Sequence, residues 1–86
     1  MTHALHPFDF NNFVEEIATQ HGVSVERLMS RSRKRDVVQA RWEVFERLSE
    51  RRWSLPQISR RWGMHHTSVL HGLRMRARQR GDATTY

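Results

Sequence analysis

The side chains best suited to hydrogen bonding with nucleic-acid bases come in one run: His65, His66, Thr67 and Ser68. Imidazole and hydroxyl groups can donate and accept, and each base pair presents a distinct pattern of donors and acceptors in the major groove. Apolar residues at helical spacing follow the run: Val69, Leu70, Leu73 and Ala77. The pattern predicts a helix that reads bases with its first turn.

The stretch before this run predicts a second helix and a tight turn. Ser54 is a favourable N-cap, Gln57 completes a capping-box pattern, and Pro56 is tolerated in the first turn. Apolar residues then recur at helical spacing as far as a break at Gly63: Leu55, Ile58 and Trp62. A short helix, a glycine turn and a longer helix ending near Arg80 form the layout of a helix-turn-helix motif.

Apolar spacing predicts two more helices near the start of the chain. The first covers about residues 10–21, with Asp9 as its N-cap and Gly22 as its stop. A short helix begins after Ser24. We expect it to offer three apolar side chains to the core: Val25, Leu28 and Met29.

A basic loop and a long helix complete the predicted elements. Residues 30–36 have no apolar period and carry four cations: Arg31, Arg33, Lys34 and Arg35. We expect Asp36 to cap a helix over about residues 37–52, with Trp42 lying over a neighbouring helix. Its predicted buried stripe is Val37, Ala40, Val44, Phe45 and Leu48. The sequence therefore predicts an all-α fold of about five helices without strands.

Length and composition favour one small domain. The chain has 86 residues, and we expect an N-terminal arm over 1–9, a helix-turn-helix domain over 10–80 and a flexible tail over 81–86. Cysteine is absent, which excludes disulfides and thiolate zinc sites. No run of about 18 apolar residues predicts a membrane span. We expect a cytoplasmic, nucleoid-associated protein.

Positive charge is concentrated in the second half of the chain. The net charge is +6; residues 1–50 hold eight of the nine acids, whereas residues 51–86 hold eight arginines and one acid. A basic half that carries a helix-turn-helix pattern is typical of a polyanion binder. An anionic membrane or an acidic partner is the competing interpretation of the charge alone.

Metal binding and catalysis find little support in the residue spacing. His71 is five or six residues from His66 and His65, so no pair among these three has the i, i+4 spacing of a helical zinc site. Ser68 has no acid near it in sequence, and no phosphate-cradling glycine loop occurs. We therefore expect no enzyme activity, no cofactor and no metal.

Three motifs carry a family resemblance, in the order SRSRKRDVVQAR, SLPQISRRWG and HHTSVLHGLR. They resemble the C-terminal DNA-binding domain of the bacterial replication initiator DnaA, which typically has a basic loop, an "AR" pair, an "SLPEIG" helix and the signature "GGRDHTTVLHA". The resemblance covers about residues 10–78. It implies a fold of the DnaA domain IV and Trp-repressor type, and double-stranded DNA as the partner.

The resemblance implies roles for individual residues. Base contacts are implied for the polar run of His65, His66, Thr67 and Ser68 in the major groove, and for Arg33 of the basic loop in the minor groove. Backbone contacts are expected, from the resemblance or from charge, at Arg31, Lys34, Arg35, Arg41, Leu55, Pro56, Arg60, Arg61, His71 and Arg76. For His71 a structural position on the helix is the favoured interpretation.

Two departures shape the functional hypothesis. Gly63-Met64-His65-His66 is one residue shorter than the family's Gly-Gly-Arg-Asp-His, so preference for the family's usual site is in doubt. No ATPase motif occurs, and the chain resembles a stand-alone copy of the domain. We expect a small regulator of replication initiation or transcription, of bacterial or phage origin. The monomer is the favoured oligomeric state. The alternative is an interaction module that docks a replication initiator or its regulator and binds DNA weakly.

Overall fold

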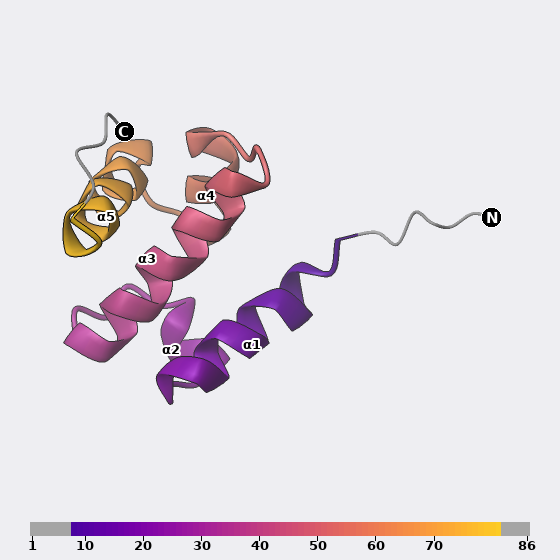
Figure 1. Cartoon of the computed structure of the whole chain (residues 1–86). Helices are drawn as coiled ribbons and strands as arrows, with labels where there is room; N and C mark the ends of the chain where they lie inside the picture. The colour runs from indigo at the N-terminus through magenta and orange to yellow at the C-terminus, as the bar shows by residue number, and fades with distance from the viewer. Residues whose placement is uncertain (1–7, 82–86) are drawn as a thin grey trace.

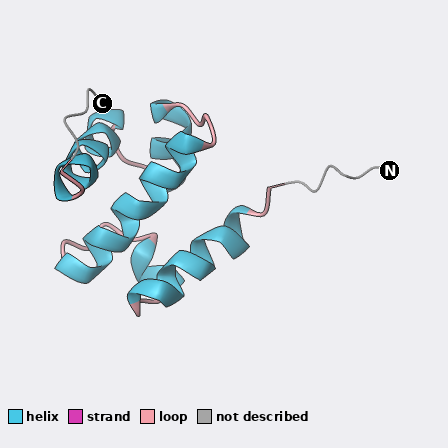
Figure 2. Ribbon diagram, viewed as in Figure 1, coloured by secondary structure: helices cyan, strands magenta, loops and turns pink. Residues whose placement is uncertain are grey.

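The computed structural model describes residues 8–81, which form five α-helices and no strand (Figures 1 and 2). The helices are α1 (Phe10–His21), α2 (Val25–Leu28), α3 (Arg35–Glu50), α4 (Leu55–Trp62) and α5 (His66–Gln79). Helix α3 runs through the middle and contacts the other four helices, with α1 and α2 at one side and α4 and α5 at the other (Figure 1). The predicted all-α helix-turn-helix fold is confirmed. Residues 1–7 of the predicted arm and 82–86 of the predicted tail lie outside the described residues.

The predicted bounds of α1 are confirmed by its two ends. The Asp9 carboxylate accepts from the Asn12 N–H at 3.1 Å, and Gly22 closes the helix with a φ of 69°. Helix α2 begins after Ser24, whose hydroxyl accepts from the Arg27 N–H. The prediction that Val25 joins the core is wrong, because α2 is a single turn that turns this residue outward and leaves it 37% exposed.

Helix α3 starts two residues earlier than predicted. Lys34 occupies its N-cap position without a capping side-chain bond, and Asp36 lies inside the first turn, where Oδ1 accepts from the Val37 N–H at 2.8 Å. An acid in the first turn still favours the helix, because it faces the positive end of the helix dipole. The predicted buried stripe is confirmed at Val37, Ala40, Val44, Phe45 and Leu48.

Two tryptophans join the parts of the molecule. The Trp62 indole N–H donates to the Leu28 carbonyl at 3.1 Å, and its ring packs edge-on against Phe45 at 4.9 Å between centroids. Trp53 stacks on Phe10 at 5.8 Å, so that α1 is attached to the corner before α4. Phe10 is half-buried at the edge of the core. These contacts make the helix-turn-helix and the N-terminal helices one packed unit.

Helices α3 and α5 approach closely at Gly72. A Cβ atom at this residue would lie 2.5 Å from Cδ1 and 2.9 Å from Nε1 of Trp42, closer than real Cβ atoms lie. The Trp42 ring also meets His71 edge-on at 5.8 Å, which confirms that it lies over a neighbouring helix. The Glu46 carboxylate of α3 adds ion pairs with Arg76 and Arg80. Packing and charge together fix the orientation of α5.

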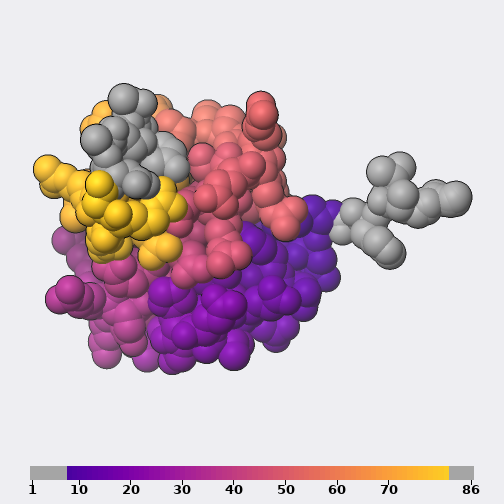
Figure 3. All heavy atoms as spheres, in the orientation of Figure 1, coloured from indigo at the N-terminus to yellow at the C-terminus, as the bar shows by residue number. Residues whose placement is uncertain are grey.

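The two ends of the described chain lie apart on the molecule. In the space-filling view, the C-terminal part of α5 lies at the upper left and α1 at the lower right (Figure 3). Within residues 8–81, no helix is both long enough and apolar enough to cross a membrane.

Candidate nucleic-acid interface

The predicted capping box and glycine turn are both present in the helix-turn-helix. The Ser54 hydroxyl accepts from the Gln57 N–H at 3.2 Å, and the Gln57 side-chain oxygen accepts from the Ser54 N–H at 2.7 Å. Gly63 ends α4 with a φ of 63°, a left-handed conformation that glycine adopts without steric cost. Local interactions therefore fix both ends of α4 and direct the chain into α5.

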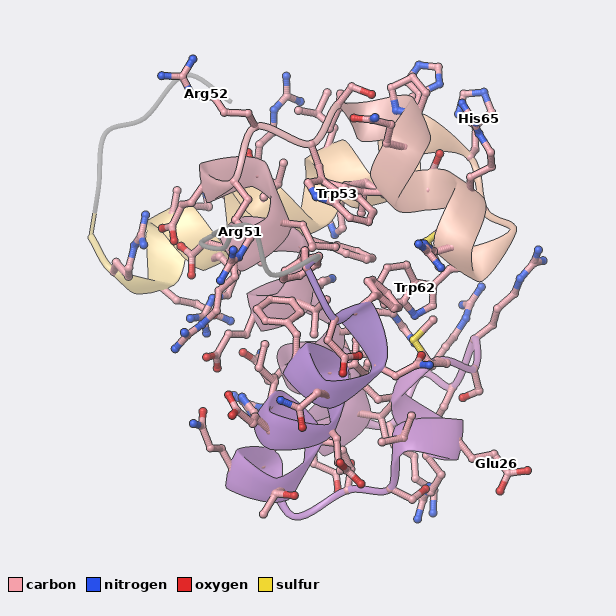
Figure 4. The ribbon with its side chains drawn as sticks, turned by 90° about the vertical axis from the view of Figure 1, so that its right-hand side faces the viewer. Glu26, Arg51, Arg52, Trp53, Trp62 and His65 are labelled. Carbon is pink, nitrogen blue, oxygen red and sulfur yellow. The ribbon has the colours of Figure 1, made fainter. Side chains whose placement is uncertain are left out.

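The first turn of α5 presents a row of exposed polar side chains. His65 is the N-cap: its Nδ1 accepts from the Thr67 N–H at 3.2 Å. The His65 ring stacks on His66 with centroids 4.4 Å apart. Figure 4 shows His65 at the outer edge of the molecule. Val69 and Leu73 are buried behind this turn, whereas the predicted base-reading residues are all exposed: His65, His66, Thr67 and Ser68.

The basic loop is held against the helix-turn-helix by Arg31. Its Nη2 donates to the carbonyl of Gly63, the residue that forms the turn between α4 and α5. Inside the loop, the Ser30 hydroxyl accepts from the Ser32 N–H and the Ser32 hydroxyl accepts from the Lys34 N–H. These bonds give the loop a defined path beside the start of α5.

Arg41 supports the loop from beneath. Its side chain is 7% exposed, and its guanidinium donates to the Ser30 carbonyl at 2.7 Å and to the Ser32 carbonyl at 2.9 Å. Burial lowers the pKa of Arg41 from its ordinary value. The geometry favours a positioning role, whereas its expected contact with phosphate stays a prediction.

An open groove of about 710 Å³ separates the basic loop from the first turn of α5. Its walls and floor include Arg31, Arg33, Trp42, His65, Thr67 and His71. Arg33 is exposed on the loop side, and His65, Thr67 and Ser68 lie on the helix side, whereas His66 is exposed but does not line the groove. The structure thus brings together, from separate elements, the residues expected to enter the minor groove and the major groove.

Other predicted backbone contacts are distributed away from this groove. Arg76 is half-buried, and its Nη2 lies 3.0 Å from Glu46 Oε1 on α3, so its charge is used inside the domain. The Arg61 guanidinium lies over the Phe10 ring at 4.3 Å. The remaining exposed candidates are Lys34 and Arg35 beside the loop, and Pro56 and Arg60 on α4, while Leu55 is half-buried.

Two contributions to the site were not anticipated from sequence. Met64 lies half-buried in the groove lining, and Arg31 acts as a link between loop and turn. The position of Met64 between Gly63 and the polar run is a signal that could have placed it there. No sequence signal identifies the carbonyl partner of Arg31. Among residues 8–81, no group of three or more His, Cys, Asp or Glu side chains is arranged to hold a metal ion.

Comparison with known proteins identifies one family. The family model described as "Bacterial dnaA protein helix-turn-helix" matches residues 11–75, which include α1 except its first residue, all of α2 to α4 and most of α5. Comparisons with curated proteins and with solved structures give no match.

Proposed function

The chain belongs to the bacterial DnaA helix-turn-helix family, and on this premise we propose that it binds specific double-stranded DNA sequences as a regulator of replication initiation or transcription. Residues 10–80 form the binding unit. In this proposal α5 enters the major groove with its first turn, and the basic loop reaches the adjacent minor groove. We propose that the DNA sites are of the initiator type but need not have the family's usual sequence.

The observation that carries the proposal is the paired exposure of Arg33 and the first turn of α5 across one groove. The bond from Arg31 to the Gly63 carbonyl connects the loop to the turn, so the two reading elements keep a common register. An exposed arginine suits a narrow minor groove, where the negative potential is enhanced. Two linked elements reading adjacent grooves provide more specificity than a helix alone.

Phosphate contacts supply affinity in this arrangement. The exposed cations Lys34 and Arg35 lie where the basic loop passes into α3. Arg60 is exposed on α4, and so is Pro56 at the start of that helix. Each neutralised phosphate contributes about −0.9 to the slope of log affinity against log salt. These contacts position the protein, whereas base contacts carry the sequence information.

Selection of random duplexes on the purified protein tests the proposal. We expect one enriched motif, with a footprint over it. Replacement of Arg33 by Ala or His66 by Ala should weaken binding to the motif more than binding to unrelated DNA, by about 5- to 100-fold for each lost base contact. Arg47→Gln is the matched control, because it removes a cation that is half exposed on α3 and paired with Glu43. In this variant the Glu43 carboxylate keeps its contact with His21 Nε2 at 2.7 Å.

The same selection distinguishes sequence-specific DNA binding from the alternative, a protein-interaction module that binds DNA weakly. If no motif is enriched and duplex affinity is micromolar or weaker at physiological salt, sequence-specific regulation is refuted. Equal losses for Arg33→Ala and Arg47→Gln would refute the role of the loop, because a non-specific charge effect would then explain both.

A further inference from the structure

We propose that His65 acts as a fixed hydrogen-bond donor toward DNA, so that the base it meets in the preferred site presents a major-groove acceptor, guanine before the others, and is not cytosine. The inference rests on the proposed function, because it assigns the base preference of one side chain in that site. It follows from the way the same imidazole ring caps α5.

The cap determines which ring nitrogen carries the proton. Nδ1 of His65 lies 3.2 Å from the backbone nitrogen of Thr67, and that N–H can only donate. Nδ1 must therefore be the unprotonated nitrogen. The Thr67 hydroxyl, 2.8 Å from the same Nδ1, then donates to it as well. In a neutral imidazole whose Nδ1 is unprotonated, the hydrogen is on Nε2.

The position of the ring directs this N–H away from the helix. Nε2 lies across the imidazole from Nδ1, which faces the first turn of α5, and His65 is exposed. Stacking on His66, with 28° between the ring planes, restrains the orientation of the ring. His65 also lines the groove between the basic loop and α5. The second ring nitrogen of this exposed side chain is consequently a donor.

A donor at this position discriminates between bases. In the major groove guanine presents two acceptors, N7 and O6, thymine presents O4, and adenine presents N7 beside its N6 amine, whereas cytosine presents only the N4 amine, a donor. An Nε2–H group directed at cytosine would leave two donors facing each other, and each would lose its water partner. Guanine on the contacted strand is favoured most, because either of its acceptors can receive the proton.

Two substitutions keep an N-cap at this position and differ from each other in the group that faces DNA, while both remove the ring that stacks on His66. Asp and Asn are both strong N-caps, so His65→Asp and His65→Asn should each preserve the start of α5. The Asn amide keeps donor hydrogens for DNA after its oxygen accepts from the helix, whereas the Asp carboxylate has acceptors only. The pair therefore tests donor character at nearly constant shape.

Selection of random duplexes on the wild type and both variants gives the decisive comparison. We expect the wild type and His65→Asn to enrich guanine and to exclude cytosine at one position. His65→Asp should enrich cytosine there, with a change of about 5- to 100-fold in the relative affinity for guanine and cytosine. Long-range ¹⁵N–¹H correlation spectra of the free protein should independently show the His65 proton on Nε2.

The possible results separate this inference from the proposed function. An unchanged motif in His65→Asp, including a uniform loss of affinity for all duplexes, overturns the inference alone, since it indicates a phosphate contact or none. A proton found on Nδ1 also overturns it. Absence of any motif for the wild type overturns the proposed function and the inference together. Thermal unfolding supplies the folding control: His65→Ala, which lacks the cap, should unfold about 4–8 °C lower, and the Asp and Asn variants should not.

Discussion

Replacement of Arg41 by methionine would test whether this residue positions the basic loop. Methionine keeps an unbranched chain of similar volume but removes the guanidinium. The change eliminates the bonds to the Ser30 carbonyl at 2.7 Å and the Ser32 carbonyl at 2.9 Å. Both carbonyls belong to the basic loop that carries Arg33. The substitution should therefore affect DNA binding through the position of Arg33.

The expected loss of stability follows from these two bonds. A hydrogen bond to a charged group contributes about 1.5–3 kcal/mol. Two effects make the loss smaller than the sum of both hydrogen bonds. The serines are half-buried, so water can reach their carbonyls after the change, and removal of the buried cation also removes its desolvation cost. We expect Arg41→Met to lower the free energy of unfolding by about 2 kcal/mol. For a domain of this size that is a large fraction of the total.

Urea unfolding and DNA titration together measure both roles of Arg41. Arg41→Lys is the matched control, because one ammonium keeps the charge but lacks the planar fork that reaches two carbonyls. We expect intermediate stability for Lys, and weaker site-specific binding for Met even where the variant is fully folded. A Met variant that unfolds like the wild type but binds DNA less tightly would refute the positioning role and favour a direct phosphate contact.

Two further predictions concern packing and charge inside the domain. Gly72→Ala should destabilise the wild type, because overpacking costs about 1–3 kcal/mol, and should destabilise a Trp42→Leu background less, because only the contact with Phe45 Cδ2 at 3.0 Å then remains; additive effects in urea unfolding would contradict this. Burial raises the pKa of Glu43, but hydrogen bonds and attraction from His21 and Arg47 outweigh it, so that the pKa is lowered overall. The carboxylate then stabilises the fold above its unfolded pKa, and this stability is lost as pH falls through the folded pKa. In Glu43→Gln the free energy of unfolding should therefore fall less steeply with decreasing pH than in the wild type. Equal slopes for the two proteins in urea unfolding would contradict this.

Features with local causes were predictable from the sequence. The capping box of Ser54 and Gln57, the glycine ends of α1 and α4, and the apolar stripes all depend on residues within a few positions of each other. The start of α3 was misplaced for a related reason. Asp36 is a good N-cap by type, but the chain uses it in the first turn, and Lys34 takes the cap position without a side-chain bond.

Features that depend on distant partners could not be predicted. The sequence predicts phosphate contacts for all three arginines, Arg31 and Arg76 from their charge and Arg41 from the family resemblance. In the structure their partners are a carbonyl 32 residues away, two carbonyls 9 and 11 residues away, and a carboxylate 30 residues away. A count of charges cannot distinguish an arginine that contacts DNA from one that supports the surface. Only packing makes that distinction.

Arginines that support the basic loop also keep its cations in place before DNA binds. Gathering the loop cations beside the N-terminus of α5 is unfavourable in the free protein, because like charges repel one another and the positive end of the helix dipole. Arg31 and Arg41 offset this by donating to neutral carbonyls, so they hold the loop without adding an acid that would cancel its field. Glu46 instead neutralises cations on the distal part of α5. In the proposed complex, phosphate removes the repulsion that the free domain must sustain. The arrangement thus concentrates unneutralised positive charge where Arg33 and the polar run face outward.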